Sequence, residues 1–360
     1  MKNTENRTNS IFSGDMQRLI SDWKYGDMLK GKSIMITGAT GLIARYLTSF
    51  LLEMNRQKHA GIKVLALARN MEKAENCFSS YLDDELFTIV NQDVCEPIIT
   101  DAKADYIFHA AGSASASAIR TNPVGIIRAN TIGTINIMDY AVKSGSEKVV
   151  FASTREIYGR ISDISSISEK DMGITDPLES RNCYPESKRM AEAICESYRQ
   201  QYGIGYSVLR IAHTYGPTMQ LEGDGRVMAD FIEAVVNGHD ILLNSDGTAI
   251  RAFCYVTDTV QGIMDVMFKG ESGGAYNLAN EEEPYQIRDV ARQLTEMYPE
   301  RQLKVVFANP DDSVKKGYLG YKIVKLDTSK LESLGWKPAV GLSEGMKRTV
   351  DYFIEERECE

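Results

Sequence analysis

Short apolar runs alternate with amphipathic stretches along residues 32–216, and this alternation constrains the fold more than any other feature. Predicted strands occupy 33–37, 63–68, 88–90, 106–111, 148–154 and 206–211. Predicted helices separate most of them, most clearly at 44–54, 124–143 and 184–202. Buried parallel strands are continuous apolar runs, and a helix usually forms the crossover between two of them. We therefore predict an α/β chain with a Rossmann-type, doubly wound parallel sheet.

The regular alternation ends near Gly216, beyond which glycine and aspartate gather at 222–226 and 244–247. We predict a dinucleotide-binding domain over 32–216, with 251–282 returning to its sheet. Residues 217–250 and 283–360 are predicted to form a smaller C-terminal α/β lobe that binds the substrate. Residues 1–31 are polar and mixed. We interpret them as an N-terminal leader that packs on the main domain or is partly disordered.

Composition narrows the classes of protein and of partner. The 360 residues carry 41 Lys and Arg against 50 Asp and Glu, and this net charge of −9 disfavours non-specific binding to nucleic acid or an anionic membrane. No apolar run approaches the roughly 18 residues of a membrane span, and the polar first ten residues predict no secretory signal. Six scattered cysteines without a CxxC pair and four histidines without ligand spacing predict a reduced, cytoplasmic protein with no metal site.

The first predicted strand runs directly into a glycine-rich turn, TGATGLIA (37–44). Gly38 permits the tight turn, Gly41 lets the backbone approach a pyrophosphate at the helix N-terminus, and Ala44 allows close packing of helix on strand. A plain strand–helix turn is the alternative, but the place after the first strand of an alternating chain favours dinucleotide binding. The predicted cofactor contacts here are Gly38, Thr40, Gly41, Leu42 and Ile43.

The second predicted strand ends in Ala68-Arg69-Asn70, without the acid that usually binds the adenosine ribose of NAD. Arg69 either pairs with a 2′-phosphate, which would indicate NADP, or is a solvated loop cation. Asp93 and Val94, after the third predicted strand, are expected to border the adenine.

A YxxxK pattern, Tyr184 to Lys188, begins the helix predicted at 184–202. Side chains at i and i+4 share one helix face, so the Lys188 ammonium is expected to lower the pKa of the Tyr184 phenol. Tyr184 would then accept a proton from a substrate hydroxyl while hydride leaves for a nicotinamide. Thr154 lies 30 residues earlier, at the end of a predicted strand, where its hydroxyl can bond the same oxygen. A surface tyrosine and lysine at a helix start is the alternative.

Together these motifs resemble the extended short-chain dehydrogenase/reductase family, the nucleotide-sugar epimerases, dehydratases and decarboxylases. The resemblance covers about residues 32–340 and rests on TGATGLIA (37–44), HAAG (109–112), NTIGT (130–134), STREIYG (153–159), YPESK (184–188), LRIAHTYGP (209–217), DGRV (224–227), RAFCYVTD (251–258) and LGWKP (334–338). Within the family, the sequence is most similar to the UDP-glucuronate decarboxylases, which carry Thr-Ser-Glu where Thr154-Arg155-Glu156 stands here.

The resemblance implies a UDP-linked nucleotide-sugar substrate and NAD as cofactor, with NADP left open by Arg69. It implies that Tyr184, Lys188 and Thr154 oxidise the sugar C4 hydroxyl, and that Glu156 moves a proton or orients a water near C5 and C6. Further cofactor contacts fall on Ala110, Ala111, Gly112 and Asn130, besides Tyr184 and Lys188. Substrate contacts fall on Ser113, Arg155, His213, Arg226 and Arg251.

Two residues depart from the family pattern. Arg155 stands where 4,6-dehydratases carry the aspartate that protonates the departing hydroxyl, so it counts against dehydration. Its guanidinium either holds a C6 carboxylate, which would suppress decarboxylation and favour a uronic acid 4-epimerase, or points away from the site. His213 replaces an asparagine that contacts the nucleotide sugar, and it either takes over that contact or packs in the core.

The leading hypothesis is a decarboxylase-like enzyme with internal redox chemistry at C4. Its alternatives are 4-epimerisation, then a 4,6-dehydratase or an NADPH-dependent 4-keto reductase. A non-catalytic dinucleotide-binding scaffold is a hypothesis from another class, and the intact Thr154, Tyr184 and Lys188 argue against it. Family members commonly form homodimers through the YxxxK helix, and the face predicted here comprises Ala191, Ile194, Cys195 and Tyr198.

Overall fold

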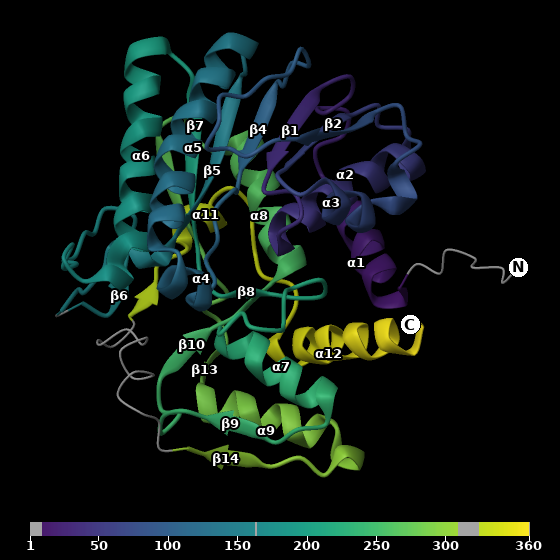
Figure 1. Cartoon of the computed structure of the whole chain (residues 1–360), viewed down its shortest axis with the longest axis vertical. Helices are drawn as coiled ribbons and strands as arrows, with labels where there is room; N and C mark the ends of the chain where they lie inside the picture. Colours follow the sequence, from purple (N-terminus) through teal and green to yellow (C-terminus); the bar gives the residue numbers. More distant parts are fainter. Residues whose placement is uncertain (1–8, 163, 309–323, 360) are drawn as a thin grey trace, which may run out of the picture.

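The computed structural model describes residues 9–162, 164–308 and 324–359. Its centre is a sheet of seven parallel strands in the order β12-β7-β5-β4-β1-β2-β3 (Figure 1). The strands are β1 (Ser33–Thr37), β2 (Lys63–Ala68), β3 (Phe87–Asn91), β4 (Tyr106–His109), β5 (Lys148–Thr154), β7 (Gly205–Ile211) and β12 (Gly274–Leu278). The predicted doubly wound α/β class is therefore confirmed.

Helices cover both faces of this sheet. α2 (Leu42–Lys58) and α8 (Val256–Lys269) pack together on one face, and α5 (Pro123–Ser144) and α6 (Cys183–Tyr202) pack together on the other. Shorter elements follow the strands: α3 (Met71–Cys77), α4 (Ala116–Thr121), α11 (Ser329–Glu332), and the 3-10 turns η1 (Ser79–Tyr81), η2 (Arg155–Tyr158) and η3 (Ser180–Asn182).

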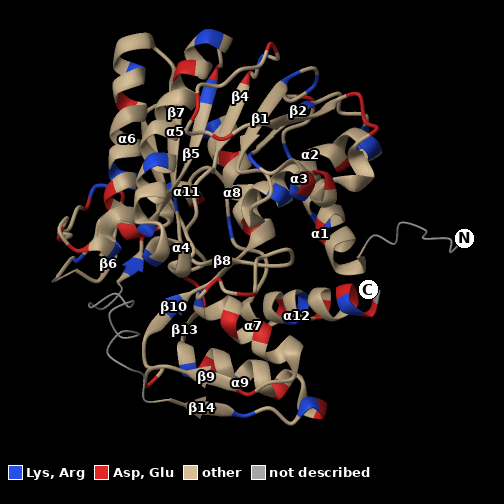
Figure 2. Cartoon of the chain, viewed as in Figure 1, with Lys and Arg blue, Asp and Glu red and all other residues tan. Residues whose placement is uncertain are grey.

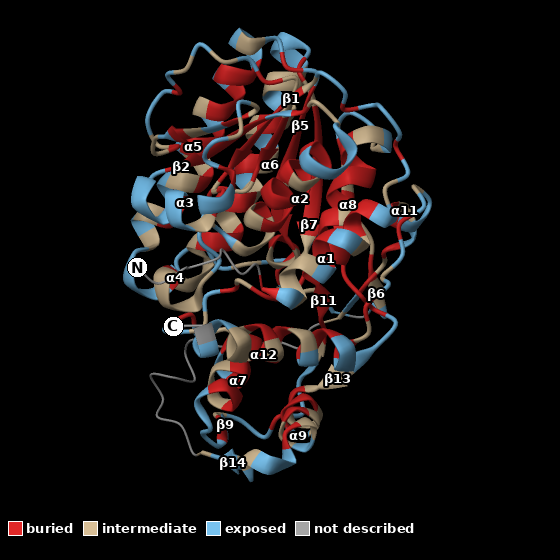
Figure 3. Ribbon diagram, turned by 90° about the vertical axis from the view of Figure 1, so that its right-hand side faces the viewer, coloured by how far each residue is buried: buried red, intermediate tan, exposed pale blue. Residues whose placement is uncertain are grey.

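The strands are buried on both sides, as their continuous apolar runs predict. Every residue of β1 is buried, and its side chains alternate between two cores: Ile34 and Ile36 pack in the core under α2 and α8, and Met35 in the core under α5 and α6. Figure 3 shows this buried centre between more exposed outer helix faces. Because all seven strands are parallel, their carboxyl ends share one edge, which is where ligands bind in open α/β sheets.

A smaller lobe lies beyond that edge (Figure 1). Its elements are α7 (Val227–Asn237), α9 (Ile287–Met297), η4 (Pro299–Arg301) and α12 (Leu342–Cys359), with the strand pairs β9 (Ile241–Leu243) with β14 (Val305–Phe307) and β10 (Ile250–Ala252) with β13 (Pro284–Gln286). Two further pairs are β8 (Thr214–Tyr215) with β11 (Cys254–Tyr255), and β6 (Ser166–Ile167) with β15 (Lys325–Leu326).

An N-terminal helix, α1 (Ser10–Ser21), joins the sheet domain to this lobe. Its Asp15 is fully buried and accepts hydrogen bonds from Tyr46 Oη on α2 at 2.8 Å and Tyr255 Oη on β11 at 2.7 Å. The Arg348 guanidinium on α12 also donates to Asp15, with Nε 3.1 Å from Oδ1. Residues 10–21 are therefore packed against three elements; residues 1–8 lie outside the described part of the chain.

Acidic and basic residues are interspersed along α6 and α12 (Figure 2). Among the described residues, no helix is both long and apolar enough to cross a bilayer. Within the same residues, no group of three or more His, Cys, Asp or Glu side chains is arranged to hold a metal ion.

Candidate active site

The glycine-rich turn between β1 and α2 forms a cradle of bare backbone. Gly38 has φ of 65°, and a Cβ added there would lie 3.0 Å from Ala111 Cα and 3.1 Å from Ala110 O, so only glycine fits. Gly41 is the N-cap of α2 and makes no side-chain cap, which leaves the first amides of the helix without a side-chain acceptor. An anion at this helix N-terminus would meet those amides, so the turn fits the pyrophosphate of a dinucleotide. Thr40, Leu42 and Ile43 belong to the same turn.

The end of β4 lies beside this turn. The prediction extended this strand to Ala111, but it ends at His109 because the Ala110 and Ala111 amides donate to Thr37 Oγ1 at 3.1 and 3.0 Å. The next residue, Gly112, has φ of 143°, and a Cβ there would lie 2.5 Å from Asn130 Oδ1. This wall of the cradle is therefore also bare backbone.

Asn130 connects the cradle to the YxxxK helix. It is fully buried, its Nδ2 donates to Ser187 Oγ at 2.9 Å, and its Oδ1 has no hydrogen-bond partner in the described structure. A Cβ at Gly112 would also lie 3.9 Å from Lys188 Nζ. Cofactor residues predicted from three separate motifs thus lie together.

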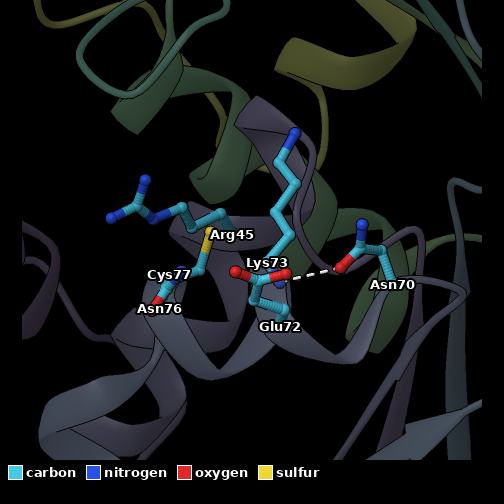
Figure 4. A pocket seen from close by; sticks show the side chains of 6 residues that line it. All are labelled: Arg45, Asn70, Glu72, Lys73, Asn76 and Cys77. Atoms are coloured by element: carbon cyan, nitrogen blue, oxygen red, sulfur yellow. Dashed lines mark hydrogen bonds between the residues drawn. The ribbon is translucent and has the colours of Figure 1, made fainter.

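The adenosine end of the predicted cofactor site lies beyond β2 and β3. Arg69 is exposed, and Asn70 accepts a hydrogen bond from the Lys73 amide at 2.9 Å to begin α3 (Figure 4). Val94 is buried, and Asp93 Oδ1 accepts from the Cys95 amide at 2.9 Å.

A cavity of about 310 Å³ opens next to α3, on the side of the neighbouring helix α2. Arg45 and Lys73 line it, with Asn70, Glu72, Asn76 and Cys77 (Figure 4). Arg69, the cation that raised the possibility of NADP, is not among the residues that line this cavity.

Thr154, Tyr184 and Lys188 meet at the end of β5. Thr154 is the last residue of that strand, and Tyr184 and Lys188 lie one turn apart at the start of α6. Lys188 Nζ donates to Ala152 O at 2.7 Å and lies 4.6 Å from the centre of the Phe151 ring. These three of the four predicted catalytic side chains are buried, whereas Glu156 is partly exposed.

Burial shifts the pKa values of both Tyr184 and Lys188. Desolvation and the negative charge of Glu156 raise the pKa of the Tyr184 phenol above its usual range, while a hydrogen bond with Thr154 and the charges of Arg226 and Arg181 lower it. The net direction is upward for the protein alone, and the predicted lowering of the Tyr184 pKa by Lys188 stays a prediction. Burial lowers the pKa of Lys188 itself to about 8, an effect that residue spacing does not reveal.

Glu156 forms an ion pair with Arg181 that the residue patterns did not predict. Arg181 Nη1 and Nη2 donate to the two Glu156 carboxylate oxygens at 2.9 and 3.0 Å, a bidentate pair with both side chains about one-fifth exposed. Arg181 lies in η3, three residues before Tyr184. A cation three residues before the YxxxK pattern is the signal that could have indicated it.

The charges of three arginines act on His213, and we call Arg155, Arg226, Arg251 and His213 the basic centre. Burial and the charges of Arg155, Arg251 and Arg226 hold the pKa of His213 well below its usual value. Its Nε2 is buried and has no partner among the described residues. Burial and the charge of Arg155 also lower the pKa of Arg251 to about 10. The four residues predicted from separate motifs thus share one electrostatic environment.

All three arginines also donate hydrogen bonds to protein groups, and Arg251 Nη1 donates to Ile250 O at 2.9 Å. Arg155 Nη2 donates to Val324 O at 2.9 Å, just before β15. Arg226 Nη2 donates to Asp224 Oδ2 at 3.0 Å, so the Asp224 carboxylate partly neutralises the charge of the Arg226 guanidinium.

Asp224 also ties the lobe to the loop that carries Ser113. Its carbonyl oxygen accepts from Ser115 Oγ at 3.1 Å, and Ser113 Oγ accepts from the Ser115 amide at 3.2 Å. Ser113 is exposed on this loop, between the end of β4 and the DGRV segment.

Known proteins match this chain over the region that contains most of these motifs. Residues 34–279 match the model of the NAD dependent epimerase/dehydratase family. UDP-glucuronic acid decarboxylase 6 of Arabidopsis thaliana is 32% identical over 315 residues, which cover 87% of this chain and 86% of the relative.

Solved structures with the same fold include two epimerases. UDP-glucose 4-epimerase of Thermotoga maritima, solved with UDP-glucose, is 25% identical with a TM-score of 0.75, over 91% of this chain and 100% of that one. UDP-glucuronic acid 4-epimerase of Bacillus cereus, solved with UDP-glucuronic acid and NAD, has the same TM-score and coverage at 21% identity.

Proposed function

The chain belongs to the NAD dependent epimerase/dehydratase family, and from this premise we propose that it oxidises and re-reduces C4 of a UDP-sugar, with decarboxylation of UDP-glucuronate as the net reaction. One observation carries the proposal: Tyr184, hydrogen-bonded to Thr154, interacts electrostatically with both members of the Glu156–Arg181 pair and with Arg226 of the basic centre. That arrangement combines a proton acceptor with the cations that a diphosphate and a uronate carboxylate need. The decarboxylase relatives, at about a third identity, support the choice of reaction.

We propose NAD as the cofactor, because the bare cradle of Gly38, Gly41 and Gly112 fits a dinucleotide backbone. Bound there, the nicotinamide accepts a hydride from the sugar and later returns it. Arg69 is exposed at the end of β2, and NADP is the alternative if that side chain binds a 2′-phosphate. Comparing the affinities of the purified protein for NAD⁺ and NADP⁺, with Arg69→Ala alongside, separates the two: a loss confined to NADP⁺ would show that Arg69 binds the phosphate.

The roles of the site residues follow from their contacts. Thr154 and Tyr184, hydrogen-bonded to each other, receive the C4 hydroxyl, and Tyr184 takes its proton as C4 becomes a ketone. Lys188, fixed by Ala152 O, supplies the positive charge that favours the phenolate once substrate is in place. These steps leave a 4-keto sugar and a protonated Tyr184.

The ketone makes the C6 carboxylate part of a β-keto acid. The C5–C6 bond breaks, carbon dioxide leaves, and the electron pair remains on C5 as an enolate. We propose that Glu156, held by Arg181, orients the water that protonates C5. Hydride returned to C4, together with the proton from Tyr184, regenerates the alcohol.

The basic centre supports an anionic substrate on a chain of net charge −9. We propose that Arg226 and Arg251 bind the diphosphate, together with His213, whose buried Nε2 is available to a ligand. Ser113, on the loop tied to the DGRV segment, is proposed to contact the sugar.

A second candidate is 4-epimerisation of the uronic acid, and Arg155 is the observation that favours it. Its guanidinium is fixed to Val324 O and lies near Arg251. A bidentate grip on the C6 carboxylate would keep that group in the plane of the ring, where the C5–C6 bond does not overlap the ketone π system. The carboxylate would then survive while C4 inverts.

The deciding experiment incubates the protein and NAD⁺ with UDP-glucuronate and separates the products. We expect a UDP-pentose and an equal amount of CO2; UDP-galacturonate without CO2 would establish the epimerase instead. Tyr184→Phe should slow either reaction by roughly 10²–10⁴-fold. Its matched control is Tyr202→Phe, since Tyr202 is an exposed residue at the far end of the same helix.

An unchanged rate in Tyr184→Phe, or no turnover of UDP-glucuronate by the native protein, would contradict the proposal. Arg155→Ser addresses the choice between the two reactions. If the native protein is a decarboxylase, Arg155→Ser should still release CO2. If the native protein is an epimerase, Arg155→Ser should release CO2 that the native protein does not.

We propose that the enzyme is a homodimer through α5 and α6. Ala191 and Cys195, predicted for that face, are fully buried in the core against the sheet, so they are not available to a partner. Exposed apolar side chains lie instead at Ile132, Ile135 and Met190, at 38, 39 and 55% exposure. Light scattering should give twice the chain mass, and Ile135→Glu should give a monomer; a monomeric native protein would contradict the proposal.

The site of action is proposed to be the cytoplasm. Among the described residues, five cysteines are free thiols.

A further inference from the structure

The catalytic face of α6 carries a third ionisable residue, Glu192. Tyr184, Lys188 and Glu192 follow one another at intervals of four residues, so they share one face of the helix. Each contacts the end of β5: Tyr184 with Thr154, Lys188 with Ala152 O at 2.7 Å, and Glu192 with Ser153.

The Glu192 carboxylate is held on both oxygens. Oε1 accepts from Ser153 Oγ at 2.5 Å and from Arg210 Nε at 3.2 Å, and Oε2 accepts from Arg210 Nη2 at 2.7 Å. The side chains of Arg210 and Glu192 are only 5% and 13% exposed. Ser153 on β5 and Arg210 on β7 are direct neighbours in the sheet. The carboxylate is therefore fixed by the sheet and cannot turn toward solvent.

Arg210 extends this network under the site. Its Nη1 donates to Tyr158 Oη at 3.0 Å, and Tyr158 Oη donates to Asn277 Oδ1 at 2.5 Å. Tyr158 ends η2, the turn that carries Glu156. Arg210 thus holds Glu192 and also contacts the turn that carries Glu156.

The other ionisable groups around Lys188 are neutral across the working pH range. His109 on β4 has its pKa lowered by burial to about 3, and Cys195 on α6 has its pKa raised by burial to about 12. Tyr184 is uncharged until alkaline pH because burial raises its pKa. Among the described residues that act on Lys188, Glu192 is the one that brings negative charge at neutral pH.

Lys188 needs the nearby negative charge of Glu192 because burial disfavours its own ammonium form. Burial lowers the pKa of Lys188 to about 8, and its hydrogen-bond acceptor, Ala152 O, is neutral. An uncharged Lys188 would not favour the Tyr184 phenolate.

We propose that Glu192 is a positioning residue for Lys188: its carboxylate, held by Ser153 and Arg210 one helical turn from Lys188, keeps the Lys188 ammonium charged. The consequence for turnover rests on the proposed function, because it matters only if Lys188 serves a reaction at Tyr184. The effect on the charge of Lys188 does not rest on it, so the two can be measured separately.

The first measurement is a direct titration of Lys188 by NMR, in protein labelled with [13Cε]-lysine and assigned with Lys188→Met. Glu192→Gln keeps the shape and a hydrogen-bond acceptor for Ser153 but removes the charge. The pKa of Lys188 should fall by roughly one unit. Ser153→Ala removes the hydrogen bond and leaves the charge, so it is the matched control and should not shift the pKa.

The second measurement is the pH dependence of kcat/KM with UDP-glucuronate. Because the reaction needs charged Lys188, activity should fall as pH rises through its pKa, and this alkaline limb should move to lower pH in Glu192→Gln. Glu192→Asp, which keeps the charge, should restore much of the native limb. A merely structural role would lower the rate and leave the limb in place.

An unshifted Lys188 titration in Glu192→Gln would overturn the proposal, even if activity is lost. If Glu192→Gln does not fold, because it leaves Arg210 buried and unpaired, the double variant Glu192→Gln/Arg210→Gln takes its place with the same expected direction. A shifted titration in a protein that does not turn over UDP-glucuronate would support this proposal and contradict the proposed function.

Discussion

Replacing Asp15 with alanine removes the one acidic group that joins α1 to three other elements. In the native protein its carboxylate accepts hydrogen bonds from Tyr46 on α2, Tyr255 on β11 and Arg348 on α12. Asp15 is fully buried, and the Arg348 side chain is 21% exposed. The variant therefore leaves a largely buried guanidinium without its counter-charge and two buried phenols without their acceptor.

The magnitude follows from these contacts. Removing one partner of a buried ion pair costs about 3–5 kcal/mol. The two phenols, Tyr46 and Tyr255, lose the acceptor that they share with Arg348, and each adds at most about 1 kcal/mol. We expect the free energy of unfolding to fall by about 3–7 kcal/mol. That is a large share of the roughly 5–15 kcal/mol that stabilises a folded protein.

The assay is urea unfolding of matched variants followed by circular dichroism. Asp22→Ala, at the exposed C-terminal end of the same helix, is the control and should change the free energy by less than about 0.5 kcal/mol. Asp15→Ala/Arg348→Met removes both charges and should recover part of the loss, because the pair is then absent rather than broken. A loss under about 1 kcal/mol in Asp15→Ala, or a double variant as unstable as the sum of the single ones, would refute the reasoning.

Two further predictions concern the cofactor turn and acid stability. Gly38→Ala should abolish NAD⁺ binding measured by calorimetry, because its Cβ would meet Ala111 Cα at 3.0 Å; Gly31→Ala, with φ of 72° and no atom within 4 Å, should cost only about 1 kcal/mol and bind normally. His109 is buried, and its pKa is lowered to about 3, so the folded protein excludes a proton that the unfolded chain binds below about pH 6.5. Stability should therefore fall by up to about 1.4 kcal/mol per pH unit between pH 6.5 and 3, and His109→Gln should show a shallower slope in denaturant titrations across that range; equal slopes would be inconsistent with a buried neutral His109.

The parts of the fold that local sequence encodes were predictable. The strand at 33–37 and the turn at 37–44 are adjacent in the chain, so their residue types report directly on the conformation found there. The bounds of the strand at 148–154 agree residue for residue, because an apolar run buried on both faces has few alternatives.

Contacts between residues far apart in the chain could not be inferred from local sequence. Asp15 reaches Tyr255 and Arg348 across 240 and 333 residues, and nothing near Asp15 in the sequence marks it as buried. The Glu192–Arg210 pair likewise depends on the neighbouring register of β5 and β7.

Helical periodicity also has a specific limit, which the wrong assignment of Ala191 and Cys195 illustrates. The period identifies residues that share a face, but not whether the sheet or a second chain covers that face. The same limit applies to Tyr184: spacing shows that Lys188 is one turn away, whereas the pKa is decided by burial among residues from other elements.

The contact between α1 and α12 has a consequence for how the chain matures. Asn9 Nδ2 donates to Tyr352 O at 3.2 Å and to Glu356 Oε1 at 3.1 Å, a separation of 343 and 347 residues. During synthesis α1 is translated more than 300 residues before α12, one of the elements against which it packs. The glycine turn and the first strands can form in that interval, but α1 cannot complete its packing until α12 is released. Completion of the contact between α1 and the smaller lobe therefore waits for α12 to be synthesised, and nascent chains halted before α12 should expose α1 to chaperones and proteases.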